Sequence, residues 1–266
     1  YNTRQMTLDC LASVIDQTTV PYELIVVDNA SEDGSAEAIA EAFPDIRLMA
    51  LEENLGFALA NNVAAKEARG DYLLLLNPDT LILDAAIDRV VDFARETPEA
   101  RIWGGRTLWG DRTRNPTSCW RRLTLWNIFC RTSGLASLFP RNPILNSEGY
   151  GGWARDTRAH VDVVTGCFML MKTADWATLE GFDARFIMYG EEVDLCLRAA
   201  RDLGAAPMIT PEATLVHYGG ASQKVRADKL VRLCKAKTAL IKVHFPPSRR
   251  WLALGLFRLW PLSRRM

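Results

Sequence analysis

Short apolar runs alternate with amphipathic stretches along residues 22–108. Each apolar run has the length of one buried strand, and these runs lie within residues 22–31, 46–51, 72–77 and 101–108. The stretches between them have apolar residues at helical spacing and are bounded by turn-forming residues; they cover residues 31–43, 56–68 and 84–96. Strands that alternate with helices of this length predict a doubly wound α/β fold with a mostly parallel sheet.

The second half of the chain is less regular. Residues 110–160 show no clear helical or strand period. Residues 161–172 then predict a strand, a turn and a second strand, and residues 193–203 predict a helix. Short apolar segments follow at residues 207–210 and 213–222, and two amphipathic stretches end the chain.

The distribution of charge separates a tail from the body of the protein. The formal net charge is zero, but residues 224–266 contain twelve Lys and Arg and a single acidic residue, Asp228. The residues before them contain 20 basic and 31 acidic side chains. We therefore expect a domain over residues 1–223, with halves 1–109 and 110–223, and a tail of basic amphipathic helices over residues 224–266.

Several classes of protein are excluded. No apolar run reaches the ~18 residues of a membrane span. The six cysteines lie far apart without a C-x-x-C pair, which excludes the common zinc motifs and favours reduced thiols in a cytoplasmic protein. The loop after Asp28 lacks G-x-G-x-x-G, so a dinucleotide cofactor is not expected. The chain starts at Tyr1 and not at Met, so no targeting signal can be identified.

Two acidic residues follow predicted buried strands. Asp28 ends the first strand, and Asp79 follows Pro78, which cannot continue a central strand. Because ligands bind at the carboxyl ends of parallel strands, both carboxylates are expected to face one crevice. Asp79 would hold Mg²⁺ or Mn²⁺ beside a diphosphate, and Asp28 would accept a hydrogen bond from a nucleobase. The alternatives are a turn cap at Asp79 and an Asx turn at Asp28.

Three carboxylates crowd the start of the helix predicted over residues 193–203. Glu191, Glu192 and Asp194 lie within four positions, and mutual repulsion raises a pKa toward the value that a general base needs. The alternative is a simple favourable interaction with the helix N-terminus. His217 precedes two glycines that allow a close backbone approach to a ligand, although a structural histidine is the alternative.

Five motifs occur in a fixed order along the chain. They are VVDNASEDGS, NLGFALANN, LLLNPDT, GFDARFIMYGEEVDLCLR and HYGGAS. Together they resemble the inverting family 2 glycosyltransferases of GT-A fold, and within these the bacterial rhamnosyltransferase-like members. The resemblance covers residues 1 to about 245.

The resemblance implies a role for each matching residue. Glu192 would be the catalytic base, with Glu191 and Asp194 in support. Asp79 and His217 would hold a divalent metal ion, Mn²⁺ or Mg²⁺. Asp28 would recognise the pyrimidine, and the nucleotide-sugar site as a whole would comprise Tyr1, Asn2, Asp28, Asn29, Asn54, Gly56, Asn62, Asn77 and Asp79.

Three features depart from the family pattern. Glu192 stands where Asp is usual, and the extra methylene moves its carboxylate by up to ~1.5 Å. Asn77 leaves Asp79 as the single carboxylate of the metal motif. The strand that precedes Tyr1 in the family is absent from this sequence.

The implied function is transfer of a sugar, with inversion, to a hydroxyl of a glycan or lipid-linked glycan in cell-surface polysaccharide synthesis. The donor would be dTDP-rhamnose or else a UDP-sugar. A catalytically impaired nucleotide-sugar-binding module is the alternative, because of the missing strand and the glutamate at position 192.

The tail has a second implication. Residues 248–266 combine arginines with Trp251, Leu252, Leu254, Phe257 and Trp260, which favours a helix on the inner face of the cell membrane. Packing of this helix against the domain is the alternative. Nucleic acid is not expected as a partner, because the tryptophans lie with aliphatic residues on one apolar face.

Overall fold

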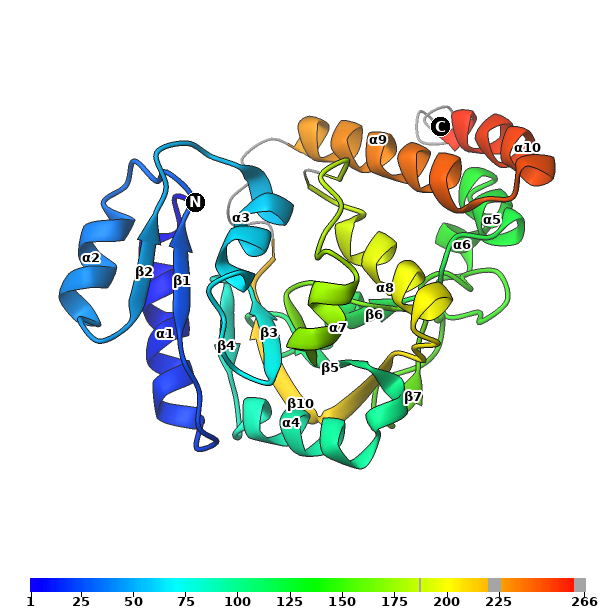
Figure 1. The fold of residues 1–266 in the computed structure, drawn as a ribbon. Helices are drawn as coiled ribbons and strands as arrows, with labels where there is room; N and C mark the ends of the chain where they lie inside the picture. The colour runs from blue at the N-terminus through cyan, green and yellow to red at the C-terminus, as the bar shows by residue number, and fades with distance from the viewer. Residues whose placement is uncertain (187, 220–225, 261–266) are drawn as a thin grey trace.

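A computed structural model describes residues 1–186, 188–219 and 226–260, and the side chains of all of these except residues 226–229. It arranges the strands into one large sheet and two small ones (Figure 1). The large sheet has the order β3 (Tyr72–Leu76), β9 (Phe168–Lys172), β5 (Ile102–Leu108), β10 (Met208–His217) and β4 (Thr80–Ile82). A further short strand, β7 (Ala159–His160), also pairs with β10. One small sheet pairs β1 (Ile25–Asp28) with β2 (Arg47–Ala50), and the other pairs β6 (Cys119–Trp120) with β8 (Val163–Val164).

The predicted α/β class is confirmed, with a mixed pairing in the large sheet. β3, β5 and β10 run in one direction, and β9 lies antiparallel between β3 and β5. The two segments expected at residues 207–210 and 213–222 form one strand, β10, whose register shifts between Thr210 and Thr214. Because β10 lies between β5 and β4, the two predicted halves of the domain share a single sheet.

Helices pack on both faces of the large sheet (Figure 1). The side chains of β9 alternate between these faces: Phe168 and Leu170 join the core formed with α4, Ala86–Glu96, whereas Met169 and Met171 join the core formed with α8, Glu191–Asp202. A strand with both faces buried has a continuous apolar sequence, as this one does.

The helices of the first half match the pattern, with one exception. α2, Ser35–Ala42, and α3, Gly56–Ala65, lie within the predicted ranges. α1, Arg4–Gln17, was not predicted, although its buried residues Cys10, Leu11 and Val14 have helical spacing. The remaining helices before the tail are the 3-10 turns Pro98–Ala100 and Pro116–Ser118, then α5 at Leu125–Thr132, α6 at Leu135–Leu138 and α7 at Thr173–Thr178.

The tail forms two helices, α9 at Arg226–His244 and α10 at Pro247–Arg258, and α10 packs on α5. Phe257 and Trp260 are buried in a core shared with α5 and α9, so packing against the domain is confirmed for these two side chains. Trp251 is 71% exposed. Within the described part of the chain, no helix is both long enough and apolar enough to cross a membrane.

The sheet is interrupted between β1 and β3. Each of these strands has one hydrogen-bonded neighbour among the described residues, β2 and β9 respectively, and they do not pair with each other.

Candidate active site

Asp79 and His217 meet because β4 pairs with β10. Thr80 lies opposite His217 in this antiparallel pair, and the N–H of Tyr218 donates a 3.0 Å hydrogen bond to the carbonyl of Asp79. This register brings Oδ1 of Asp79 to 3.5 Å from Nε2 of His217. The sequence pattern predicted a helix soon after Asp79, whereas the chain first forms the short strand β4 that creates this contact.

The two groups form an ion pair inside the protein. Burial alone raises the pKa of Asp79, but the hydrogen bond and the charge of His217 outweigh it and hold that pKa below its usual value. Burial alone lowers the pKa of His217, but Asp79 and the thiol of Cys167 outweigh it and raise the pKa to about 10.

Asp79 and Asn77 also offer side-chain oxygens that fit a divalent metal ion, and His217 can join them as a ligand only after it loses its proton. Oδ1 of Asn77 is buried and has no hydrogen-bond partner among the described residues, and the side chain of Asn77 also contributes a hydrogen bond to Asp79. No cluster of three His, Cys, Asp or Glu residues that could hold a metal occurs in the described part of the chain. A site with so few protein ligands suits Mg²⁺ or Mn²⁺, which keep waters and take phosphate oxygens from a substrate.

One short turn joins this pair to the acidic start of α8. The turn follows β8, and the carbonyl of Cys167 in it accepts a 3.1 Å hydrogen bond from the N–H of Asn77. A methyl group on the neighbouring Gly166 would lie 3.7 Å from Cβ of Glu192 and 3.5 Å from the ring of Phe57. The metal motif and Glu192 therefore flank the same turn, at one edge of the sheet.

Glu191 and Glu192 form a coupled pair at the N-terminus of α8. Gly190 precedes them with φ 91°, a backbone conformation that favours glycine. Burial, and then the charge of Glu192, raise the pKa of Glu191 well above its usual value. Burial also raises the pKa of Glu192, although backbone hydrogen bonds and the Glu191 carboxyl oppose this. Both pKa values are therefore raised, and the two buried carboxyls favour a proton between them.

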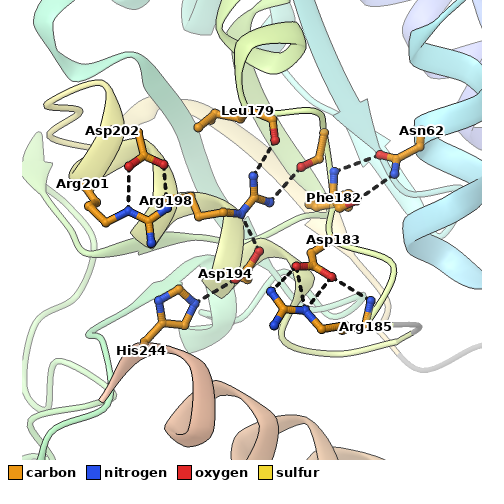
Figure 2. A network of polar contacts seen from close by, with 11 residues as sticks. Asn62, Leu179, Phe182, Asp183, Arg185, Asp194, Arg198, Arg201, Asp202 and His244 are labelled. Carbon is orange, nitrogen blue, oxygen red and sulfur yellow. Dashed lines mark hydrogen bonds and ion pairs between the residues drawn. The ribbon is translucent and has the colours of Figure 1, made fainter. Parts of the chain in front are cut away.

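Asp194 lies in a network that fixes the loop before α8 (Figure 2). Its carboxylate is fully buried and pairs with Nε of Arg198 at 2.7 Å and with Nε2 of His244 at 2.8 Å. Arg198 in turn donates to the carbonyls of Leu179 and Gly181. Both carboxylate oxygens of Asp194 are therefore engaged, one by Arg198 and the other by His244.

Asn62 completes this network from the nucleotide side. Its side-chain amide donates to the carbonyl of Phe182 at 2.8 Å and accepts from the N–H of Phe182 at 2.9 Å (Figure 2). These two bonds tie α3 to the loop before α8. In this arrangement Asn62 positions the loop rather than offering its amide to a ligand.

The remaining nucleotide-side residues gather around the loop after β1. Asn29 donates to Oδ1 of Asn54 and to the carbonyl of Gly56, and it accepts from the N–H of Leu55. Asn54, Leu55 and Gly56 are therefore held against β1. Phe57, whose ring contacts Gly166, follows directly, so this loop reaches the same edge of the sheet.

Asp28 is buried at the end of β1. One oxygen of its carboxylate accepts from the N–H of Ser31, so the Asx turn is present, and this leaves its other oxygen for a ligand. The N–H of Asn2 donates to Oγ of Ser31, and Oδ1 of Asn2 accepts from the N–H of Glu32. Tyr1 is 41% exposed beside them.

Two features of the site were missed from the sequence. The turn at Gly166–Cys167 was recognised only as a connection between strands, and its glycine was the available signal. His244 has no neighbouring residues that mark it as part of a site, and it lies 50 residues from Asp194. No local pattern could have linked it to α8.

Acidic and polar side chains at the ends of β1, β3 and β10 occupy the edge where α/β proteins bind ligands. A family model described as Glycosyl transferase family 2 matches residues 1–178, and the chain belongs to that family. This confirms the family and the GT-A fold expected from the motifs.

Two relatives have names that describe their activity or pathway. The chain is 28% identical over 93% of its length to "O-antigen biosynthesis protein RfbC" of Myxococcus xanthus, of which it spans only 18%. It is 27% identical over 78% of its length to "N-acetylglucosaminyl-diphospho-decaprenol L-rhamnosyltransferase" of Mycobacterium tuberculosis, of which the match covers 70%.

Solved structures share the fold at lower identity. The mannosyltransferase PcManGT of Pyrobaculum calidifontis, in complex with GDP-Man and Mn²⁺, superposes with a TM-score of 0.60 at 18% identity, covering 100% of this chain and 71% of that one. S. aureus TarS in complex with UDP gives 0.56 at 16% identity, covering 97% and 68%.

Proposed function

We propose that this protein is an inverting glycosyltransferase that moves a sugar from a nucleotide sugar to a hydroxyl of a glycan or lipid-linked glycan in cell-surface polysaccharide synthesis. The best candidate donor is dTDP-rhamnose, followed by a UDP-sugar. The observation that carries this proposal is the shared turn: Asn77 bonds to Cys167, and Gly166 lies against Glu192. The names of the two relatives support the polysaccharide pathway and rhamnose.

The donor would be held at the edge formed by Asp28, Asn54 and Asp79. One carboxylate oxygen of Asp28 accepts from Ser31, and the other, which has no hydrogen-bond partner among the described residues, would accept from a pyrimidine ring N–H. Asp79, with His217 and Asn77 beside it, would hold a divalent ion, and when bound this ion neutralises the charge that develops on the diphosphate leaving group. The solved mannosyltransferase that contains Mn²⁺ supports such a site by analogy of fold.

Glu192 would act on the acceptor. It takes the proton of the attacking hydroxyl as that oxygen forms a bond to the anomeric carbon and the bond to the diphosphate breaks. A single displacement from the face opposite the leaving group inverts the configuration. Glu191, whose carboxyl shares a hydrogen bond with that of Glu192, would keep Glu192 oriented.

The test is a transfer assay with dTDP-rhamnose and a panel of UDP-sugars, with and without Mn²⁺ or Mg²⁺. We expect metal-dependent release of the nucleoside diphosphate, and NMR of the product should show the inverted anomer. Tight nucleotide binding without transfer or hydrolysis, under any of these conditions, would instead support the alternative of an impaired binding module.

We also propose a peripheral contact with the inner face of the membrane, now limited to the exposed part of α10. Trp251 and Leu252 are exposed apolar side chains of this helix, whereas Phe257 and Trp260 are buried. If the variant Trp251→Ser/Leu252→Ser binds anionic vesicles as strongly as the wild type does, this contact is wrong.

A further inference from the structure

Two exposed aromatic side chains lie at the carboxyl ends of neighbouring strands. Trp109 directly follows β5 and Tyr218 directly follows β10, and these two strands are parallel and paired. Tyr218 also comes directly after the candidate metal ligand His217, and its N–H donates to the carbonyl of Asp79 at 3.0 Å. The two aromatic residues therefore stand beside the metal motif, at the edge of the sheet where the donor diphosphate is proposed to bind.

Each ring packs against the glycine that follows the other ring. A methyl group on Gly110 would lie 2.8 Å from two carbons of the Tyr218 ring, and one on Gly219 would lie 3.2 Å from the Trp109 ring. Glycine at position 110 therefore permits an approach that a side chain would prevent. The contact still leaves Trp109 36% and Tyr218 40% exposed. Neither the indole N–H nor the phenol O–H has a hydrogen-bond partner among the described residues.

A tight turn after β5 fixes the backbone at Trp109. The N–H of Trp109 donates to the carbonyl of Thr113 at 2.8 Å, and the N–H of Arg112 donates to the carbonyl of Trp109 at 2.8 Å. Asn115, at the end of this turn, is fully buried, and its side-chain amide donates to the carbonyl of His217 at 3.5 Å. The turn is thereby tied to β10, so a ligand would meet the ring on a preorganised backbone and lose less entropy on binding.

The proposed reaction brings two sugar rings to this edge. The anomeric carbon of the donor is joined through one oxygen to the diphosphate, and the acceptor hydroxyl attacks that same carbon. Both sugars therefore lie close to the metal motif. A pyranose has a face of C–H groups that packs favourably on the electron-rich face of an aromatic ring, and hydroxyls at its rim that can bond to a free N–H or O–H.

We propose that Trp109 and Tyr218 form a stacking platform for a sugar ring of the substrates. Large aromatic surfaces with a few free polar groups are typical of small-molecule sites. This inference rests on the proposed function and assigns residues that recognise its sugar. The sugar belongs either to the donor or to the acceptor, and the two arms of the test separate these sources.

The donor arm compares dTDP-rhamnose with dTDP, and UDP-glucose with UDP, by calorimetry in the presence of Mn²⁺. The ratio of the two affinities measures the contribution of the sugar. If the platform holds the donor sugar, Trp109→Leu and Tyr218→Leu should each lower this ratio about tenfold and leave the affinity for the free nucleotide unchanged.

The acceptor arm uses saturation-transfer NMR with methyl glucoside, methyl galactoside and methyl rhamnoside, in the presence of dTDP and Mg²⁺. If the platform holds the acceptor sugar, each leucine variant should weaken glycoside binding about tenfold and leave the donor ratio unchanged. In either arm Trp109→Phe, which keeps an aromatic ring, should recover most of the loss. Trp126→Leu removes a tryptophan that is 47% exposed on α5 and should behave as wild type.

The platform is overturned if neither leucine variant changes the donor ratio or the glycoside affinity, or if Trp126→Leu shows the same loss. An equal loss for free nucleotide and nucleotide sugar would assign the rings to the nucleotide and also reject it. A thermal melt shows whether each variant is folded, and since the rings are tested separately, one folded variant is sufficient. Wild-type turnover, measured separately, tests the proposed function: sugar binding that depends on the rings, in a protein without turnover, would retain the platform and reject the transferase.

Discussion

Nε2 of His244 lies 2.8 Å from Oδ1 of Asp194, and this contact joins the C-terminal helix α9 to the helix that carries the candidate base. Asp194 is fully buried, and its other oxygen is bound by Arg198, which holds the carbonyls of Leu179 and Gly181. The tail therefore takes part in positioning the loop before α8, and it is not an appendage to the domain.

Removal of the His244 imidazole should weaken both stability and turnover. His244→Ala leaves one oxygen of a buried carboxylate without a partner, which costs about 1–3 kcal/mol in the free energy of unfolding. His244→Gln retains a donor and should cost less. Because the loop before α8 shifts, kcat should fall more than the donor KM changes. Urea denaturation and transfer kinetics measure these effects. His160→Ala, which removes an exposed histidine, is the matched control, and equal stability of His244→Ala and wild type would contradict the role.

Glu191 and Glu192 should respond differently to the same substitution. Glu192→Gln removes the proton acceptor and should lower the transfer rate by about 10²–10⁴-fold with nucleotide binding intact. Glu191→Gln removes a carboxyl that only supports Glu192 in the proposed mechanism, so it should cost less than about tenfold. Single-turnover transfer rates for both variants decide this. Loss of transfer in Glu191→Gln alone would exchange the two assignments.

The raised pKa of Glu191 makes the stability of the protein depend on pH. A carboxyl whose folded pKa lies above its unfolded value favours the folded state while it is protonated, and that contribution is lost as the pH rises through the folded pKa. Glu191→Gln cannot ionise, so its stability relative to wild type should increase with pH. Thermal melts from pH 5 to about pH 9 test this, with the exposed Glu41→Gln as control. A constant difference across this range would mean that Glu191 has an ordinary pKa.

Asp79 should determine whether nucleotide binding depends on metal. With Asp79→Ala, the affinity for UDP or dTDP in the presence of Mn²⁺ should fall at least about tenfold, and chelation of the metal should then have little further effect. Asp71→Ala, at the opposite end of β3, is exposed and should behave as wild type. Calorimetry with and without Mn²⁺ measures both. Retention of full Mn²⁺-dependent binding by Asp79→Ala would rule out this metal ligand.

A buried ion pair should hold α9 on the body of the domain. Glu148 pairs with Nε of Arg131 at 2.7 Å and with Lys237 of α9. Burial raises the pKa of Glu148, but Lys237 and Arg131 outweigh it and lower that pKa. Burial is the largest influence on Lys237 and lowers its pKa, although the charge of Glu148 opposes this. Glu148 has two cationic partners, so the pair as a whole favours the charged carboxylate.

Lys237→Met should therefore destabilise the fold by about 3 kcal/mol near pH 7, because it leaves a buried carboxylate with one partner. A lowered folded pKa stabilises the protein above the unfolded value of 4.5, and this contribution is lost as the pH falls through the folded pKa. The difference from wild type should then shrink in acid. Urea denaturation of Lys237→Met and of the exposed Lys235→Met, at several pH values, tests this. Equal stability of the two variants at neutral pH would show that the pair contributes nothing.

The strands and helices with strong local patterns were predictable, and the antiparallel features were not. The apolar run at residues 72–77 predicted β3. The helix predicted from residue 193 begins in the structure at Glu191, two residues earlier. The insertion of β9 between β3 and β5 was not visible, because an apolar run buried on both faces has the same composition whichever direction its neighbours take. β4 has three residues, too few for a period to be recognised.

By itself the sequence determined the α/β class, the family and most of the residues proposed for the candidate site, because strand ends, turn residues and motif order are local properties of the chain. The tertiary structure decided which of these residues meet. Register placed His217 beside Asp79, and one turn placed Gly166 between the metal motif and Glu192. Packing of α9 supplied His244 to a carboxylate far away in sequence. Contacts of this kind depend on burial and pairing between distant segments, and no local period encodes them.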